Sequence, residues 1–322
     1  MYNGPARRAA ALRIAVLGAS GFLGLNSVSD LMRRGFEIVA LCPKDESSLI
    51  LEEHGIEIID WDMLNPKSMD VSLDGIDWLV HLASTTNPKE SMLDPDKDSA
   101  NLTASSLIFQ RGIDSGVKKI LFPSSGGTVY GDPGFGPVDE TFRINPTIPY
   151  AKTKLAIENE LFRLTEGTET TPVVLRLGNP YGVHQHPNKG TGVITAWLEA
   201  VRDGKPVIVY GDGGSARDFF YVSDAVGAIR MALASEDAKG IYNIGSGVAT
   251  SLNSILDIIE DVTKRIPTVT RVSQRPSDVV KAIALDSSKA KREFGWEAVV
   301  GLRDGIQLTW DWVQLGEPLN LA

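Results

Sequence analysis

The stretch Ile14-Ala15-Val16-Leu17-Gly18-Ala19-Ser20-Gly21-Phe22-Leu23-Gly24 decides the fold, because an apolar run leads into a turn with glycine at every third position. Gly18 permits a tight bend, Gly21 lets the backbone approach phosphate groups, and Gly24 lets the following helix pack closely on the strand. The free N–H groups at the start of such a helix favour negative charge. A second apolar run, Phe36 to Leu41, follows at the spacing of a β-α-β unit. The stretch therefore predicts a site for the pyrophosphate of a dinucleotide.

Short apolar runs and helical stretches go on alternating through the first half of the chain. The further strands are expected at Ile56–Asp60, Trp78–Leu82, Lys119–Pro123 and Val173–Leu177, and two long helices at Asn101–Ser115 and Tyr150–Thr165. Buried strands separated by amphipathic helices are typical of a parallel sheet that is covered on both faces. The predicted fold class is therefore α/β, with a doubly wound parallel sheet of the Rossmann type.

The pattern changes after Arg176. Residues 178–190 are rich in turn formers and predict a long functional loop without regular structure. Helices are then expected at Gly192–Arg202, Ser223–Ala234 (with Ser223 as N-cap) and Leu252–Thr263, and strands at Val207–Tyr210 and Ile241–Ile244. We expect a NAD(P)-binding domain over residues 12–178 and a smaller, partly interwoven α/β substrate region over residues 179–322.

Composition limits the class of partner and the compartment. The 322 residues carry a net charge of −9, which argues against nucleic acid as the main partner, although an anionic ligand could still be bound by a few placed arginines. Cys42 is the only cysteine, so there is no intramolecular disulfide and no cysteine-based zinc site. No apolar stretch resembles a signal peptide or a membrane span. We expect no metal site and a cytoplasmic setting.

Tyr150-Ala151-Lys152-Thr153-Lys154 is the second strong signal, because Tyr150 and Lys154 lie one helical turn apart on the same face. A nearby ammonium group favours the phenolate and so lowers the pKa of a tyrosine from about 10. Such a pair can act as an acid and base near neutrality. Taken alone, the pair is more often a surface feature, and the glycine turn upstream favours the functional interpretation.

These motifs carry a resemblance to a known family. The glycine turn, Ser124-Ser125-Gly126-Gly127-Thr128-Val129-Tyr130-Gly131 and Pro149–Lys154 resemble the extended short-chain dehydrogenases/reductases, and among them the NAD-dependent nucleotide-sugar epimerases and dehydratases of the UDP-glucose 4-epimerase type. Further motifs follow in family order at Arg176–Gly182, Tyr210–Gly213, Arg217–Asp224, Tyr242–Gly245 and Arg275–Val279. The resemblance covers nearly the whole chain.

The resemblance implies a role for particular residues. Tyr150 would be the catalytic base, Lys154 would lower its pKa and hold the nicotinamide ribose, and Asn101 would help to place that lysine. The implied cofactor-binding residues are Gly18, Ser20, Gly21, Phe22, Leu23, Gly24, Asp62, Met63, Leu82, Ala83, Asn101, Ser124, Tyr150 and Lys154. The implied substrate-binding residues are Ser125, Asn179, Arg217 and Arg275, with the two arginines on the diphosphate. Arg217 could instead pair with Asp218 or Asp224.

The implied reaction is a transient oxidation. Tyr150 would take the proton of the sugar 4-hydroxyl as hydride passes from C4 to NAD, and hydride returned to the other face would invert C4. The resemblance also implies a homodimer that is formed through the two long helices. A net reductase of 4-keto nucleotide sugars, a dehydratase and a non-catalytic nucleotide sensor remain alternatives. A dehydratase would carry an Asp-Glu pair where Gly127-Thr128 stands, and a sensor would not need Tyr150 and Lys154.

Two positions depart from the family pattern. Gly126 stands where these epimerases usually carry Ser or Thr, so Ser125 is the candidate for the missing hydroxyl, with Ser124 and Thr128 behind it. Cys42 stands where a carboxylate usually bonds the adenosine ribose, so NADP is not excluded, although NAD is favoured. His81 is expected to be a hydrogen-bonded residue at a strand end, with a place near the nicotinamide as the alternative.

Overall fold

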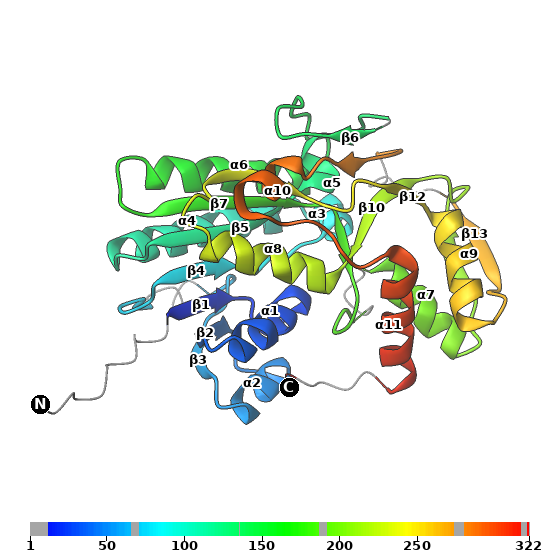
Figure 1. Cartoon of the computed structure of the whole chain (residues 1–322), viewed down its shortest axis with the longest axis horizontal. Coiled ribbons are helices and arrows are strands. Elements are labelled where there is room, and N and C mark those ends of the chain that lie inside the picture. The colour runs from blue at the N-terminus through cyan, green and yellow to red at the C-terminus, as the bar shows by residue number, and fades with distance from the viewer. Residues whose placement is uncertain are drawn as a thin grey trace, which may run out of the picture.

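The computed structural model describes residues 12–65, 71–134, 136–186, 192–273, 280–316 and 321. A parallel sheet of seven strands runs through its centre in the order β11-β7-β5-β4-β1-β2-β3 (Figure 1). These strands are β1 (Arg13–Leu17), β2 (Glu37–Cys42), β3 (Glu57–Asp60), β4 (Trp78–His81), β5 (Lys119–Ser125), β7 (Thr171–Leu177) and β11 (Gly240–Ile244). The chain adds strands on one side of β1 and then on the other, so the order reverses between β1 and β4. A crevice at such a reversal is where this class of sheet binds ligands.

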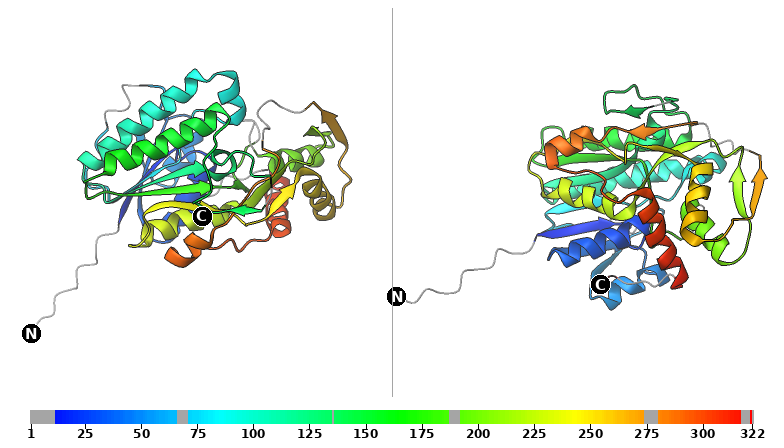
Figure 2. Two further views of the ribbon diagram at one scale, coloured as in Figure 1. Left: turned by 90° about the horizontal axis from the view of Figure 1, so that it is seen from above. Right: turned by 45° about the vertical axis from the view of Figure 1, so that its right-hand side comes forward.

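Helices cover both faces of this sheet, as the view from above shows (Figure 2). One face carries α4 (Asp96–Asp114) and α6 (Pro149–Thr165), and the other carries α1 (Phe22–Arg33), α8 (Val222–Ala234) and α10 (Ser288–Phe294). Successive residues of a strand point to opposite faces. Ile14 and Val16 of β1 therefore belong to one buried cluster, and Ala15 and Leu17 belong to the other. The predicted Rossmann fold is confirmed.

Short elements connect and flank the sheet. They are η1 (Glu46–Ser48), α2 (Leu49–Glu53), α3 (Pro88–Leu93), α5 (Gly126–Val129) and the strand pair β6 (Pro137–Val138) with β14 (Ala284–Leu285). The segment after β4 runs through α3 into α4, and both helices pack on α6. The carboxyl end of the sheet is thereby enclosed by parts of the chain that the sequence places far apart.

The C-terminal half builds a smaller layer beside the sheet. It contains a three-stranded sheet of β8 (Asn179–Tyr181), β10 (Ala216–Tyr221) and β12 (Ala249–Ser251), a pair of β9 (Val207–Tyr210) with β13 (Val269–Val272), and the helices α7 (Val193–Arg202), α9 (Leu252–Thr263) and α11 (Leu302–Gln314). A third buried cluster, which includes Trp197, Ile255 and Ile306, joins these helices. The C-terminal half also supplies β11, a strand of the main sheet, and α8, a helix that covers it.

Three local expectations need correction. Residues 179–181 form β8, because they pair with Phe219–Tyr221 of β10, and such long-range pairing leaves no signal in a turn-rich sequence. Helix α8 begins at Val222 with Tyr221 as an extended N-cap residue, so Ser223 is not the cap. Helix α4 begins at Asp96, more than a turn before Asn101.

The described part of the chain has neither a helix with the length and apolar character needed to cross a bilayer nor a group of three or more His, Cys, Asp or Glu side chains that could hold a metal ion.

Candidate active site

The glycine turn forms a narrow cradle between β1 and α1. Gly18 has a φ of 75°, and a Cβ on it would come within 2.8 Å of the backbone nitrogen of Ala83. A Cβ on Gly24 would overlap the carbonyl oxygens of Gly18 and Ala19. Gly21 is the N-cap residue of α1 and brings no side-chain cap, which leaves the first N–H groups of the helix for a ligand. The structure thus brings Ala83, from the end of β4, directly against the turn.

The ends of β2 and β3 meet at the same edge. Cys42 is buried and its thiol bonds to Ser20 of the glycine turn, and burial raises the pKa of that thiol to about 11. Asp60 pairs in register with Cys42, and its carboxylate accepts a 3.2 Å hydrogen bond from the backbone N–H of Lys44. A carboxylate therefore lies beside the end of β2, one strand over from the position where the sequence lacks one.

Two of the predicted cofactor-binding residues follow β3. Asp62 accepts a 2.8 Å hydrogen bond from the backbone N–H of Leu64, which fixes a tight turn at this edge. Met63 is buried beneath it, in the cluster that also holds Leu17. Both residues thus lie at the carboxyl edge of the sheet.

Tyr150 and Lys154 lie on one face of α6. The Lys154 Nζ is 5.7 Å from the centroid of the Tyr150 ring and 4.8 Å from that of Phe122. It also lies 3.5 Å from the carbonyl oxygen of Pro123, on β5. The helix therefore holds the ammonium group over the end of β5, with the phenol beside it.

Burial dominates the acid–base properties of this pair. It raises the pKa of Tyr150 to about 12, and the charge of Asp98 acts in the same direction. Burial lowers the pKa of Lys154 to about 8, against the carboxylates of Glu158 and Asp98, which favour the ammonium form. Burial and Asp98 both oppose the phenolate of Tyr150, and the expected lowering of its pKa by Lys154 stays a prediction.

The end of β5 carries the two candidate hydroxyl groups. Ser124 Oγ is buried and has no hydrogen-bond partner among the described residues. Ser125 Oγ accepts a 2.9 Å hydrogen bond from Thr128 Oγ1. A Cβ on Gly126 would come within 3.0 Å of the carbonyl oxygen of Arg176 and would press on Leu285. The close approach of β7 and β14 thus gives a physical reason for glycine where the family usually has Ser or Thr.

Two of the predicted substrate-binding residues, Asn179 and Arg217, lie on β8 and β10, which pair with each other. Asn179 lies near the turn that follows β5, because a Cβ on Gly127 would come within 3.2 Å of its Oδ1. Arg217 donates a 2.9 Å hydrogen bond to the carbonyl oxygen of Ala216. The oxygens of Asp218 accept hydrogen bonds from Ser246, Gly247 and Leu285, and Asp224 accepts from the backbone of Val299 and Val300. Arg275 and the rest of its motif lie outside the described residues.

Asn101 bonds to the segment that follows β4. Its Oδ1 accepts hydrogen bonds from the backbone N–H and the hydroxyl of Thr85, at 2.9 and 3.0 Å, and its Nδ2 donates to Thr86 Oγ1 at 2.9 Å. Asn101 thereby fixes the chain between β4 and α3, and α3 packs on α6, the helix that carries Tyr150 and Lys154. The role of Asn101 in placing Lys154 stays a prediction.

His81 is buried at the end of β4. Its Nε2 lies 2.8 Å from Ser105 Oγ, and its ring packs edge-on against Phe109 and Phe122. Burial and the charge of Lys154 lower the pKa of His81 to about 3, so the imidazole is neutral at physiological pH. The arrangement agrees with a hydrogen-bonded core histidine.

Sequence reasoning missed two buried acids near the pair. Asp98 lies on α4 and accepts hydrogen bonds from Thr86 and Ser91, and Glu158 lies on α6 and binds Arg176. Glu158 follows Lys154 by one helical turn, a spacing that could have drawn attention to it. Nothing local distinguishes Asp98 from the exposed acids beside it.

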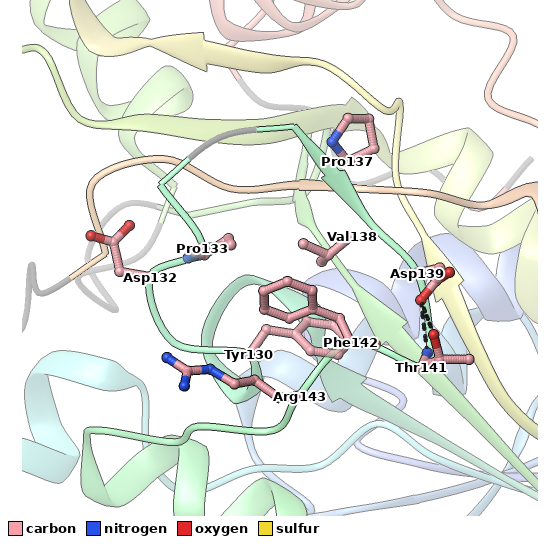
Figure 3. A pocket seen from close by; sticks show the side chains of 9 residues that line it. All are labelled: Tyr130, Asp132, Pro133, Pro137, Val138, Asp139, Thr141, Phe142 and Arg143. Atoms are coloured by element: carbon pink, nitrogen blue, oxygen red, sulfur yellow. Dashed lines mark hydrogen bonds between the residues drawn. The ribbon is translucent and has the colours of Figure 1, made fainter.

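A separate cavity of about 710 Å³ lies beside Tyr130 (Figure 3). The rings of Tyr130 and Phe142 meet edge to face at 6.2 Å, and Asp139 accepts hydrogen bonds from Thr141 across its rim. Arg143 also lines the cavity, together with the loop before β6. The lining includes none of the residues predicted for cofactor or substrate.

A Rossmann sheet with a glycine cradle after β1 and a Tyr–Lys pair on the helix beside β5 defines a short-chain dehydrogenase/reductase. The chain belongs to the NAD dependent epimerase/dehydratase family, whose model matches residues 14–245. This membership confirms the predicted family, and NAD as the cofactor.

Individual relatives match over nearly the full length. The UDP-glucose 4-epimerase of Bacillus subtilis is 32% identical over 94% of this chain and 96% of its own. The dTDP-4-dehydro-6-deoxyglucose reductase of Escherichia coli is 30% identical over 91% of this chain and 95% of its own. The crystal structure of Thermus thermophilus UDP-glucose 4-epimerase in complex with NAD superposes with a TM-score of 0.87, at 30% identity, over 94% of this chain and 99% of that one.

Proposed function

We propose that this protein is a nucleotide-sugar 4-epimerase of the UDP-glucose/UDP-galactose type that oxidises C4 transiently with bound NAD. The observation that carries the proposal is the pair of half-buried Tyr150 and buried Lys154, which lies at the end of β5 in a sheet that also bears the glycine cradle. The full-length similarity to UDP-glucose 4-epimerases supports the choice of substrate class.

The residues present fit a dinucleotide. Gly18 and Gly24 leave room that a side chain would fill, and the start of α1 offers unpaired N–H groups to a pyrophosphate. The buried Ser124 Oγ, which lacks a protein partner among the described residues, would gain one from the nicotinamide end of the cofactor. NAD, when bound, supplies the hydride acceptor and donor, and its cationic ring favours the phenolate form of a nearby tyrosine.

The chain's own groups then move the proton. Tyr150 Oη takes the proton of the sugar 4-hydroxyl as C4 is oxidised and returns it when C4 is reduced. The Lys154 ammonium stabilises the phenolate that is present before Tyr150 takes the proton and again after the proton is returned. Ser125 is the candidate donor to the sugar oxygen, because it accepts from Thr128 and so keeps its own proton available.

Asn179 and Arg217 are proposed to bind the nucleotide diphosphate, together with Arg275. Asn179 and Arg217 lie on strands β8 and β10, which pair with each other in the three-stranded sheet. An arginine can bond two phosphate oxygens at once, so a single side chain gives both charge and orientation. The sugar would then lie between this clamp and Tyr150.

A second copy of the chain is proposed to pack on α4 and α6. These helices lie side by side on one face of the sheet (Figure 2). Leu107 on α4 is 45% exposed, and Ser106 of α4 bonds Glu160 of α6 at 2.6 Å, which makes one continuous surface of the two helices. This surface is the expected homodimer interface.

A net reductase of 4-keto nucleotide sugars is the second candidate. Cys42 replaces the usual ribose carboxylate, which would otherwise repel the 2′-phosphate of NADP, and the similarity to the E. coli reductase points the same way. An epimerase regenerates its cofactor in each cycle and can retain it, whereas a net reductase must exchange it.

The test is to denature freshly purified protein, identify the released nucleotide, and assay the conversion of UDP-glucose to UDP-galactose. Near-stoichiometric NAD with conversion is the expected result. An empty protein that binds NADPH in preference to NAD, and consumes it with a 4-keto sugar, would establish the reductase instead.

A further inference from the structure

Asp98 is a buried carboxylate beside the catalytic pair, and the reaction above does not use it. It lies in the first turn of α4 and is 3% exposed. Its Oδ1 accepts a 2.5 Å hydrogen bond from Thr86 Oγ1, and its Oδ2 accepts from Ser91 Oγ, whose side chain is fully buried. Two hydroxyl donors and the positive end of a helix stabilise negative charge there. No ion pair of the described residues includes Asp98.

Lys154 is the complementary buried charge. It is 8% exposed, and its ammonium lies 3.5 Å from the carbonyl oxygen of Pro123 without a salt bridge to any described acid. Helix α3, which carries Ser91, and helix α4, which carries Asp98, both pack on α6, the helix of Lys154. A buried cation and a buried anion in the same solvent-excluded region interact much more strongly than the same charges in water.

Other titratable groups also lie around Lys154. Glu158, on the same helix, also favours the ammonium form of Lys154 and is itself paired with Arg176 of β7 at 2.6 Å. His81 of β4 is neutral near pH 7 because its pKa is lowered to about 3. Tyr150 carries no charge until it is deprotonated. Asp98 differs from Glu158 because it has no ion-pair partner among the described residues.

We propose that Asp98 is a positioning residue whose negative charge keeps Lys154 protonated and sets the pH range in which the Tyr150–Lys154 pair works. The inference rests on the proposed function of that pair. As a positioning residue, Asp98 does not touch the substrate. It acts through Lys154, and through Thr86, which also bonds Asn101 in the segment after β4.

The direction of the effect follows from the charges. The carboxylate of Asp98 raises the pKa of Lys154 and that of Tyr150, because it favours the ammonium and opposes the phenolate. Replacing it with a neutral isostere therefore lowers both pKa values. The enzyme would then keep its base at lower pH and lose its ammonium group sooner as the pH rises.

The test compares Asp98→Asn with Asp96→Asn, a matched control that removes the same charge from an exposed residue in the same helical turn. Protein labelled with ¹³C at the lysine ε-carbons is titrated by NMR, and the Lys154 signal is assigned from its loss in Lys154→Arg. We expect the Lys154 midpoint, near pH 8 in the parent chain, to fall by about one pH unit in Asp98→Asn. It should stay in place in Asp96→Asn. An unchanged midpoint in Asp98→Asn would overturn the proposal.

Two further variants separate charge from structure. Asp98→Glu keeps the charge and should restore the parent midpoint, whereas Thr86→Val removes a hydrogen bond without removing the charge and should leave the midpoint unshifted. If Asp98→Asn does not fold, Asp98→Ser removes the same charge with a smaller side chain. A shift in Thr86→Val as large as that in Asp98→Asn would show a purely structural role and would also overturn the proposal.

The pH profile of kcat/KM gives the functional readout. Both limbs should move to lower pH in Asp98→Asn, whereas a loss of packing alone would reduce the rate at every pH without moving the limbs. The NMR titration needs neither substrate nor turnover. If the parent chain has no epimerase activity but the Lys154 midpoint shifts in Asp98→Asn, the proposed function is contradicted and this inference stands. If the parent chain is an active epimerase but the midpoint does not shift, this inference is contradicted and the proposed function stands.

Discussion

Glu158 and Arg176 form a buried ion pair, with 2.6 Å between Glu158 Oε2 and Arg176 Nη2 and side chains that are 1% and 4% exposed. The guanidinium also donates to Tyr130 Oη at 3.0 Å, and Tyr130 in turn donates to Asn243 Oδ1 at 2.7 Å. One network therefore ties the catalytic helix α6 to β7, α5 and β11. It fixes α6 one turn beyond Lys154.

Glu158→Gln should lower the free energy of unfolding by about 3–5 kcal/mol, because it leaves the Arg176 cation buried without a counter-charge. Glu160→Gln is the control on the same helix, since Glu160 pairs with the exposed Arg163 and such pairs contribute about 0–1 kcal/mol. Urea unfolding followed by circular dichroism measures both. Equal losses in the two variants would show that the buried network does not anchor α6.

Tyr150→Phe should leave the fold and NAD binding intact and reduce turnover at least 100-fold, about the smallest contribution expected of a general acid–base group. The substitution removes only the hydroxyl from a half-buried side chain. Epimerisation rate and released NAD are measured on the same preparation. A variant with full NAD content and an unchanged rate would rule out Tyr150 as the base.

His81 should make the protein less stable as the pH falls. Its pKa is lowered to about 3 in the folded chain, so below about pH 6.5 the unfolded chain binds a proton that the folded chain does not. The stability present above pH 6.5 is then lost by about 1.4 kcal/mol per pH unit, or about 2 kcal/mol at pH 5.

The check is urea unfolding at pH 7 and pH 5 for the parent chain and for His81→Gln. The variant should lose about 2 kcal/mol less between the two pH values, because its side chain does not titrate. Parallel pH dependence in both proteins would mean that His81 takes up its proton in the folded state.

Gly24→Ala should damage the cradle far more than Gly21→Ala. A methyl group at position 24 would overlap two backbone carbonyl oxygens, whereas one at position 21 would lie 3.2 Å from the Gly18 oxygen. Overpacking against backbone costs about 1–3 kcal/mol or more, and α1 must move away from β1 to relieve it. NAD affinity by calorimetry and thermal stability are measured for both. Similar behaviour of the two variants would contradict the close packing of α1 on β1 at Gly24.

The features that the sequence predicted well are local ones. The glycine turn and the Tyr150–Lys154 spacing each lie within one element or one turn, so the residue pattern contains the geometry. The parallel sheet was predictable for a similar reason, since strands buried on both faces have continuous apolar runs.

The missed features depend on contacts between distant segments. Asp98 and Glu158 gain their surroundings only when α4, α6 and β7 pack together, and β8 exists only because β10 pairs with it. Desolvation likewise has no sequence signature, which is why the sequence did not predict that burial raises the pKa of Tyr150. Arg275 lies beyond the described residues, and its role on the diphosphate stays a prediction.

The central claim is that Tyr150 supports a reversible oxidation at C4 in which the same hydride leaves and returns. The most direct measurement follows UDP-glucose that carries deuterium at C4 in ordinary water, with the product analysed by NMR and mass spectrometry. We expect UDP-galactose that keeps the deuterium at C4. Loss of the deuterium to solvent, or the absence of any C4 epimer from a protein that contains NAD, would contradict it.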